Sequence, residues 1–269
     1  MSNILTSTSP PEFLVKFYSA LPPSDARHPR VTLTFAQSLD SKIAGQGGQQ
    51  LILSGKESMI MTHWMRTMHD AIMVGIGTAL NDNPQLNRKS RHLPPLEPAS
   101  NGHGNPYHLP RPIILDTNLR LKLDCKLVQN FNNGCGRRPW VFCAAPSFPD
   151  DAVFARKMKL LTDVGIRVIQ VPTEAGQIDI RAVLKTLSEL GVRSLMVEGG
   201  ASVIKSFFRG VSNPSGNFVD AVIVTVAPVF VGQQGIRYDL NLQSSSELQH
   251  VHSEILGKDA VLMLKSHGS

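Results

Sequence analysis

Residues 194–210 read SLMVEGGASVIKSFFRG, and this stretch decides the fold. It begins with a short apolar run typical of a buried strand, continues through two glycines that favour a turn, and ends in a segment with helical spacing. Val203, Ile204, Phe207 and Phe208 form the apolar face of that helix. A strand, a tight turn and a helix in this order are the unit from which parallel α/β sheets are built.

Strands and helices alternate on both sides of this stretch. Apolar or alternating runs predict strands at 31–38, 71–75, 112–116, 140–143, 166–171, 219–228 and 261–265. Helical spacing predicts helices at 12–20, 55–69 and 179–190, and through Phe154, Met158 and Leu161. Ser54 and Glu57 have the spacing of a capping box for the second helix. The pattern predicts a three-layer α/β fold, with a mostly parallel central sheet and helices on both faces.

The chain of 269 residues is expected to form one domain over 31–269, preceded by an extension over 1–30. Within it, residues 88–110 contain five prolines and read as an irregular loop insertion. His92, His103 and His108 of this loop match no metal-ligand spacing, so we expect a surface loop and no metal site.

Composition bounds the function. The net charge of +6 comes from scattered Lys and Arg, and only 6% of residues are aromatic, so we expect no nucleic-acid partner and favour an anionic small molecule. No apolar run is long enough to span a membrane, and the amino terminus does not resemble a signal peptide. The chain has three cysteines, an odd number, and none are spaced as C-x-x-C, so we expect a reducing compartment and hence the cytoplasm.

The turn after residue 197 is the first candidate site. Glu198 ends the strand, Gly199 and Gly200 follow, and Ala201 and Ser202 open the helix. Backbone N–H groups at a helix amino terminus bind phosphate, and Glu198 would face the ligand there. The alternative is an ordinary strand–helix turn with a solvated glutamate.

A second candidate lies at 74–84, VGIGTALNDNP, where Gly75 and Gly77 directly follow a strand. Thr78 supplies a hydroxyl and Asp82 an acceptor for ribose or amide groups. Leu80 stands at the third glycine position, so the segment is not a Rossmann fingerprint. A tight turn without function is the competing interpretation.

Two weaker candidates follow. Asp40 and Lys42 come just after the first strand, where they either line a cleft or form a solvated turn. Arg66 on the helix at 55–69 is either a surface arginine or a phosphate anchor. The pair His252 and Glu254 has the start of a zinc deaminase signature, but the required P-C-x-x-C is absent, which excludes that class of deaminase.

Together, VTLTFAQSLDSKIA (31–44), VGIGTALNDNPQLN (74–87), RPIILDT (111–117) and LMVEGGASVI (195–204) resemble one family. It comprises the reductases of riboflavin biosynthesis that act on a phosphorylated ribosylaminopyrimidine, in their stand-alone fungal or archaeal form. The reductase half of the bacterial bifunctional deaminase–reductase is similar. The resemblance implies a dihydrofolate-reductase-like fold, a homodimer, and NADPH as hydride donor with NADH as an alternative.

The resemblance also implies residue roles. The cofactor would be bound by Gly77, Thr78, Asp82, Thr117, Gly199, Gly200, Ala201 and Ser202. The substrate would be bound by Arg66, Leu86, Glu198 and a basic residue at Arg88 or Lys89. As a hypothesis of mechanism, Glu198 holds the ribose or assists proton transfer, and Asp40 and Lys42 orient the substrate or donate a proton.

Two rivals remain open at this point. One is a folate reductase on the same fold, which the E-G-G and T-A-L-N-D-N-P segments disfavour. The other is a non-catalytic protein that binds NADPH or nucleic acid, in which Glu198, Lys42 and Arg66 need not converge.

Overall fold

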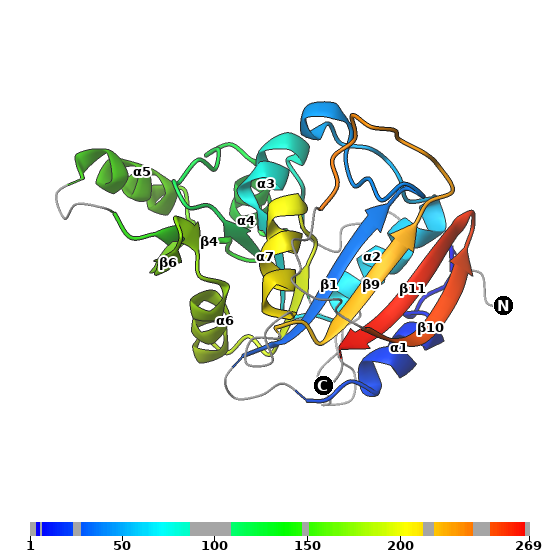
Figure 1. Ribbon diagram of the computed structural model, residues 1–269. Coiled ribbons are helices and arrows are strands. Elements are labelled where there is room, and N and C mark those ends of the chain that lie inside the picture. Colours follow the sequence, from blue (N-terminus) through cyan, green and yellow to red (C-terminus); the bar gives the residue numbers. More distant parts are fainter. Residues whose placement is uncertain are drawn as a thin grey trace.

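The computed structural model describes residues 4–5, 7–23, 28–86, 109–146, 151–211, 218–238 and 248–266. Its centre is a nine-stranded sheet in the order β10-β11-β9-β1-β8-β2-β3-β4-β5 (Figure 1). The seven strands from β9 to β5 are parallel, and β11 and β10 add an antiparallel hairpin at one edge. The mostly parallel sheet expected from the sequence is confirmed.

The longest strands are β1 and the two strands of the hairpin. Their bounds are β1 Arg30–Gln37, β2 Ala71–Gly75, β3 Arg111–Leu115, β4 Trp140–Ala144, β5 Arg167–Val171, β8 Ser194–Val197, β9 Ala221–Val226, β10 Leu248–Leu256 and β11 Asp259–Ser266. A separate small hairpin pairs β6 (Thr173–Glu174) with β7 (Gln177–Ile178).

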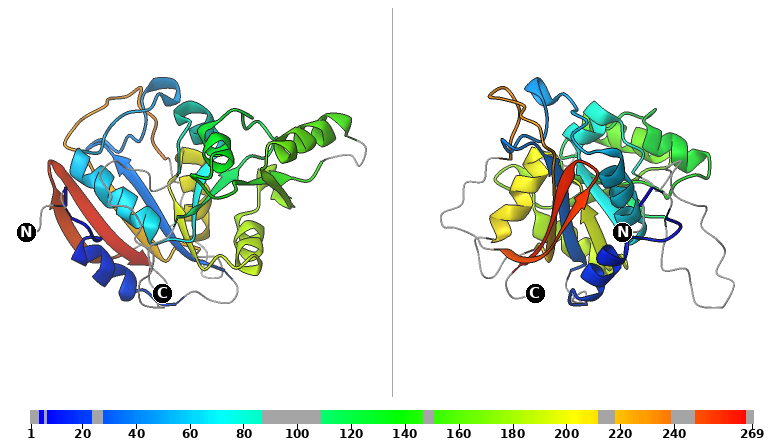
Figure 2. Two further views of the ribbon diagram at one scale, coloured as in Figure 1. Left: turned by 180° about the vertical axis from the view of Figure 1, so that it is seen from behind. Right: turned by 90° about the vertical axis from the view of Figure 1, so that its right-hand side faces the viewer.

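Helices cover both faces of the sheet, as expected for three layers (Figures 1 and 2). Side chains of α6 (Ile180–Glu189) and α7 (Ala201–Val211) pack into the core on one face. The core on the other face includes side chains of α1 (Glu12–Ser19), α2 (Lys56–Thr67), α3 (Ile76–Asp82), α4 (Lys126–Asn132) and α5 (Ala152–Asp163). A single 3-10 turn, η1, spans Gln46–Gly48.

Strand β8 shows why a continuous apolar run is required at the centre of the sheet. It lies between the parallel strands β1 and β2, and all four of its residues are buried. Leu195 and Val197 join the core beneath α6 and α7, while Met196 joins the core on the opposite face. Both faces are therefore covered by helices, and a polar residue would be solvated on neither.

Local details differ from the sequence prediction at two helices. Helix α2 begins at Lys56, with Gly55 as its N-cap and no side-chain cap, so the capping box at Ser54 is wrong. The Gly55 N–H instead donates to Asp259 Oδ2 at 2.6 Å, a contact from a distant strand that replaces the local cap. The segment after β2, whose glycines suggested a tight turn, forms the short helix α3.

Helix α1 packs against the core, with Leu14, Phe17 and Tyr18 buried. The division of the chain into an extension over 1–30 and a domain over 31–269 stays a prediction. The insertion at 88–110 lies almost entirely outside the described residues. None of the helices in the described ranges has the length and apolarity that crossing a membrane requires.

Candidate functional site

The two glycine-rich turns meet because β2 and β8 are adjacent parallel strands. The Gly75 N–H donates to the Gly199 carbonyl at 3.0 Å, and the Glu198 N–H donates to the Met73 carbonyl at 3.0 Å. The Gly200 N–H donates to Thr78 Oγ1 at 3.1 Å. These contacts join the start of α3 to the start of α7 at the carboxyl edge of the sheet, where ligands bind in open α/β folds.

A cavity of about 330 Å³ opens at this edge. Among the residues predicted for the site, those that line it are Gly77, Thr78, Asp82, Glu198, Gly200, Ala201 and Ser202. Apolar side chains of Phe35, Ile43 and Ile236 form part of its wall, so the cavity combines an apolar surface with few polar groups, as small-molecule sites do.

The close approach of the two turns requires glycine at residue 75. A Cβ at this position would lie 2.8 Å from Cγ2 of Val203 on α7. At Gly77, two residues further on, a Cβ would meet no atom within 4 Å. Residue 75 therefore sets the distance between α7 and β2, whereas Gly77 faces open space.

We expect Gly75→Ala to lower the free energy of unfolding by about 1–3 kcal/mol, the usual cost of overpacking. Gly77→Ala is the matched control and should leave stability unchanged or slightly raised, because alanine is favoured over glycine in a helix. Urea unfolding followed by circular dichroism measures both. Equal stabilities of the two variants would show that the β2–α7 contact does not limit packing.

Arg66 and Glu198 form a two-point ion pair beside the cavity. Arg66 Nε lies 2.6 Å from Glu198 Oε1, and Nη2 lies 2.7 Å from Oε2. Their side chains are only 16% and 15% exposed. Burial alone would lower the pKa of Arg66, but the charge of Glu198 and its hydrogen bonds outweigh burial and raise that pKa. Arg66 is therefore not a surface arginine: it is a fixed cation bound to the glutamate of the cavity wall.

The first turn of α7 supplies the donors that a phosphate needs. N–H groups in the first turn of a helix have no acceptor within the helix. Ala201, Ser202 and Val203 occupy this turn and line the cavity, and the Gly200 N–H is already held by Thr78. These groups, with the open side of Gly77, fit the phosphates of a dinucleotide.

Asp82 lies at the end of α3 and is half-buried in the cavity wall. Burial raises the pKa of its carboxyl group. Asn81 beside it donates from Nδ2 to the Gly48 carbonyl at 3.3 Å, which ties α3 to the 45–49 segment. Asp82 is thus placed as an acceptor at the rim between α3 and that segment.

Asp40 lies outside the cavity wall and binds the backbone of a distant loop. Its Oδ1 accepts from the Val231 N–H at 3.0 Å, and its Oδ2 accepts from the Gly232 N–H at 2.8 Å. The Ser38 hydroxyl also donates to Oδ1, at 2.6 Å. The hydrogen bond from Ser38 and those from Val231 and Gly232 hold the pKa of Asp40 well below its usual range. An ionised carboxylate with both oxygens occupied favours a positioning role over proton donation.

We expect Asp40→Asn to loosen the loop that follows β9. The amide replaces one acceptor oxygen by a donor that cannot bind an N–H group. Hydrogen exchange at Val231 and Gly232 should accelerate by roughly tenfold, the equivalent of one lost hydrogen bond of ~1.4 kcal/mol. Exchange in β1 serves as the internal reference. Unchanged protection at both amides would remove this role from Asp40.

Lys42 is buried, with a 5% exposed fraction. Its Cγ would lie 2.9 Å from a Cβ at Gly235, so it packs beneath the same loop. Its neighbours Ile43 and Ala44 line the cavity, and Ala44 pairs with Ile236 through a β-bridge. The side chain of Lys42 itself is not part of the cavity wall.

The remaining predicted residues lie elsewhere. Leu86 is 1% exposed and belongs to the core on the face of the sheet covered by α2 and α4, with a φ of 41°. Thr117 follows β3, and its carbonyl accepts from the Ala144 N–H at 3.3 Å, away from the cavity wall. Arg88 and Lys89 lie outside the described residues. Gly199 adopts a φ of 92° and shapes the turn without lining the cavity.

Sequence reasoning missed the apolar part of the site. Leu51, Leu53 and Ile236 line the cavity from segments with no periodic pattern. The one sequence signal for Ile236 is that it is an isolated apolar residue among the glycines and polar residues of 232–237. The position of these residues depends on how the 43–53 and 229–238 segments fold back over β1.

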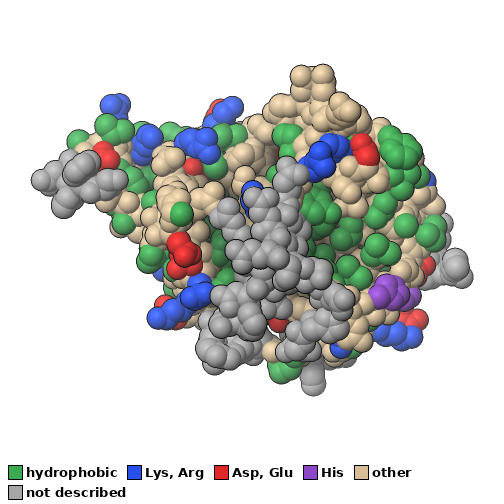
Figure 3. Space-filling view, in the orientation of Figure 1, with side chains coloured by type: hydrophobic (Ala, Val, Ile, Leu, Met, Phe, Trp, Pro, Cys, Tyr) green, Lys and Arg blue, Asp and Glu red, His purple; other side chains and the backbone are tan. Residues whose placement is uncertain are grey.

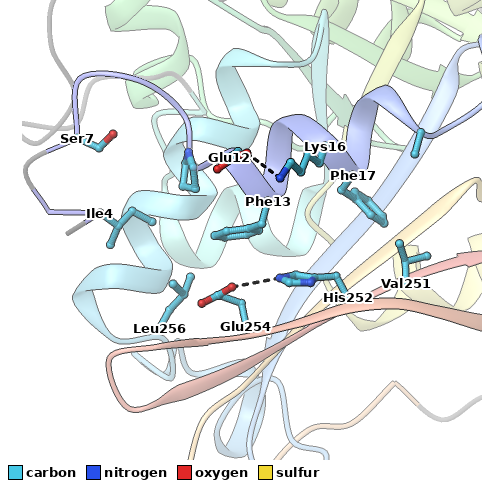
Figure 4. A pocket seen from close by; sticks show the side chains of 12 residues that line it. Ile4, Ser7, Glu12, Phe13, Lys16, Phe17, Val251, His252, Glu254 and Leu256 are labelled. Carbon is cyan, nitrogen blue, oxygen red and sulfur yellow. Dashed lines mark hydrogen bonds and ion pairs between the residues drawn. The ribbon is translucent and has the colours of Figure 1, made fainter. Parts of the chain in front are cut away.

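A larger groove of about 600 Å³ lies between α1 and β10 (Figure 4). Phe13 stacks on the ring of His252 at 5.7 Å, and His252 Nε2 lies 3.1 Å from Glu254 Oε2. The groove shares no lining residue with the cavity at α3 and α7. His252 and Glu254 thus pair with each other on an edge strand, and among the described residues no cluster of three or more potential metal ligands occurs.

Known relatives match this chain over most of its length. A reductase of Debaryomyces hansenii named 2,5-diamino-6-ribosylamino-4(3H)-pyrimidinone 5′-phosphate reductase is 35% identical over 220 residues, which is 80% of this chain and 81% of that protein. A Schizosaccharomyces pombe protein of the same name is 34% identical over 250 residues, 89% of each chain.

Solved structures agree with the sequence relatives. The riboflavin biosynthesis reductase Rib7 of Saccharomyces cerevisiae superposes with a TM-score of 0.68 at 26% identity, covering 95% of this chain and 98% of that one. The RibD protein of Acinetobacter baumannii, at 22% identity and a TM-score of 0.68, shares the fold over 88% of this chain and 58% of its own. The family model of the RibD C-terminal domain matches residues 29–262, and the chain belongs to this family.

Proposed function

We propose that this protein reduces the ribosyl group of 2,5-diamino-6-ribosylamino-4(3H)-pyrimidinone 5′-phosphate to a ribityl group, using NADPH, in riboflavin biosynthesis. The observation that carries the proposal is the convergence of a fixed Arg66–Glu198 ion pair with the α7 amino terminus at one cavity. Relatives that bear the name of this reductase are 32–36% identical to the chain over three quarters or more of its length.

The cofactor supplies hydride when bound, which would be added at C1′ of the opened ribosylamine. The α7 amino terminus, with Ala201 and Ser202, would hold its phosphates, and Thr78 fixes the turn that leads to them. Asp82 would accept hydrogen bonds from a ribose or an amide. The half-buried side chains of Phe35 and Ile43 would supply an apolar wall against the bound ligands.

Glu198 would hold the substrate as an acceptor. Both of its oxygens receive hydrogen bonds from the Arg66 guanidinium, and each keeps a further lone pair for a hydroxyl group. Arg66 uses two of its five donors on Glu198, so the others are left for substrate oxygens. Held by Arg66 in this way, Glu198 is proposed to position a substrate hydroxyl group.

The proton for the departing ring oxygen needs another source. Lys42 is our candidate, directly or through water, because its neighbours Ile43 and Ala44 line the cavity. A basic residue at Arg88 or Lys89 is proposed to bind the substrate phosphate. Gly199 would support the cofactor by shaping the turn that leads into α7.

The test is to mix the purified protein with NADPH and the diamino-ribosylaminopyrimidinone phosphate, and to follow the absorbance of the reduced nicotinamide. Substrate-dependent loss of absorbance at a rate above the blank is the expected result. Dihydrofolate in place of the substrate is the control, and it should give no loss. Turnover of dihydrofolate alone would point to a folate reductase, and NADPH binding without turnover of either would point to a non-catalytic role.

A homodimer is also proposed, with cytoplasmic location and NADH as an alternative donor. Hydrophobic side chains gather over β9 and β11 on the face shown in Figure 3. On these two strands, Val226, Leu262 and Leu264 are half-buried. A face of this kind fits a self-complementary contact between two copies. Sedimentation velocity tests it, with a mass of twice 29.4 kDa expected.

A further inference from the structure

Four arginines gather at the edge of the sheet opposite the cavity. Arg111 and Arg167 begin β3 and β5, the two neighbours of β4, and Arg137 and Arg138 lie just before β4. The cavity lies at the carboxyl ends of β1, β2 and β8 instead. The cluster is therefore separate from the site proposed for reduction.

Trp140 is the centre of this arginine cluster. It is the first residue of β4, and its register partner on β5 is Arg167. The guanidinium carbon of Arg111 lies 4.3 Å from the centre of the indole ring, and that of Arg167 lies 5.0 Å from it. Two cations on one ring are held in place by the aromatic surface between the strands.

Backbone carbonyls accept hydrogen bonds from the guanidinium groups of Arg111, Arg137 and Arg138. Arg111 Nη1 donates to the Arg138 carbonyl at 2.9 Å, and Arg138 Nε donates to the Gly165 carbonyl at 2.8 Å. Arg138 Nη2 donates to the Ile166 carbonyl at 3.4 Å, and Arg137 Nη1 donates to the Asp70 carbonyl at 3.3 Å. Each arginine has five N–H donors, so most of the donors in the cluster remain available.

The cluster is not neutralised within the described part of the chain. Its four guanidinium groups form no ion pair with a carboxylate there. The nearby Asp70 carboxylate instead accepts from the backbone N–H groups of Arg193 and Ser194. Burial and the charges of Arg137, Arg167 and Arg138 lower the pKa of Arg111 to about 10. The fold therefore holds like charges together at a cost that an anion would relieve.

We propose that this arginine cluster binds a small anion carrying several phosphate charges, such as an oligophosphate. Guanidinium groups bind phosphate oxygens through paired N–H donors. The donors of the cluster come from two strands and from the segment before a third. They are therefore spread over a wider area than one carboxylate group can contact. Arg111 and Arg137 are half-buried, and Arg138 and Arg167 are exposed, so the cluster is open to solvent.

The alternative is that the arginines only pack against Trp140 and stabilise the edge of the sheet. Both interpretations predict some loss of stability on substitution, so stability cannot separate them. Only the proposal of an anion site predicts that oligophosphate binding is lost when the arginines are substituted. Affinity for the anion, measured where each variant is folded, is therefore the deciding quantity.

The probe is inorganic tripolyphosphate, titrated calorimetrically at low salt into protein saturated with NADPH, so that the proposed cofactor site is filled. The variants are Arg111→Gln with Arg167→Gln, the charge-preserving Arg111→Lys with Arg167→Lys, and Arg181→Gln as control. Arg181 lies on α6, outside the cluster, and its guanidinium group lies over the ring of Phe218. Circular dichroism establishes that each variant is folded at the titration temperature.

We expect wild-type protein and the Arg181→Gln control to bind tripolyphosphate, with orthophosphate binding at least tenfold more weakly. The double glutamine variant should lose at least tenfold in affinity, and the double lysine variant should lie between. Absence of binding to wild type, or equal binding by the folded double glutamine variant, would overturn the proposal. The outcome does not depend on whether the reductase reaction is found.

Discussion

Glu198→Gln is expected to lower kcat/KM for substrate-dependent NADPH oxidation by at least about 100-fold, or ~2.7 kcal/mol of transition-state stabilisation. Glutamine keeps the size of the side chain but loses the negative charge that Arg66 holds in the cavity wall. One of its two terminal groups becomes a donor, so it cannot accept from the guanidinium at both positions. Steady-state kinetics with the pyrimidine phosphate measures the change.

NADPH binding should survive in this variant, because the α7 amino terminus and Thr78 do not depend on the carboxylate. Fluorescence titration of the reduced nicotinamide checks that point. Turnover within a factor of three of wild type would remove Glu198 from the mechanism. Loss of NADPH binding together with turnover would show instead that the variant disturbs the whole turn.

A double-mutant cycle separates chemistry from stability at the same pair. Arg66→Met or Glu198→Gln alone leaves one largely buried charge without its partner. Each variant should destabilise the fold by at most about 3–5 kcal/mol, because the two side chains keep some contact with solvent. The double variant should recover part of that stability, since no unpaired charge remains. Its activity should stay as low as that of Glu198→Gln, because stability and substrate binding are different functions of the pair.

Thr78→Ala with Asp82→Ala is expected to raise the KM for NADPH by at least tenfold, with a smaller effect on kcat. Thr78 Oγ1 accepts the Gly200 N–H, and its loss leaves that group unpaired next to the turn that we propose binds the cofactor phosphates. A lost hydrogen bond of this kind is worth about 1–1.5 kcal/mol, roughly a factor of ten in affinity. Asp82 adds an acceptor at the rim of the cavity.

A matched control for this variant exists on other helices. Thr186 on α6 donates its hydroxyl to the Ala182 carbonyl, and Asp163 at the end of α5 pairs with Lys159. Thr186→Ala with Asp163→Ala makes the same chemical change away from the cavity and should leave the KM for NADPH unchanged. Thr78→Ser alone should retain most of the affinity, because the hydroxyl is kept. Wild-type KM in the Thr78 and Asp82 double variant would contradict the assignment of the cofactor site.

The candidate site could be predicted in part because of a rule of parallel sheets. Strands β2 and β8 were expected from their apolar runs, and the turns after them contain Thr78 and Glu198. Because parallel strands end at the same edge, two turns from distant parts of the chain can meet. The resemblance to the reductase family selected these turns from several that looked similar.

Other predictions needed distances that no pattern contains. Leu86 lies in the core and Asp40 lies against the 231–232 backbone, and neither position follows from spacing. The Ser54 cap failed because Asp259, from the other end of the chain, binds the start of α2. In each case a contact between remote segments replaced the local interaction that the sequence suggested.

The sequence by itself determined the α/β class, the strand–turn–helix unit at 194–210 and the glycines that allow two turns to approach. These features depend on local spacing and on backbone freedom, which are written along the chain. Only the tertiary structure decided that Arg66 is the partner of Glu198, 132 residues away, and that Arg111 and Arg167 lie over the ring of Trp140. Pairing of charges depends on which strands become neighbours, and that order follows from the packing of all helices and strands at once.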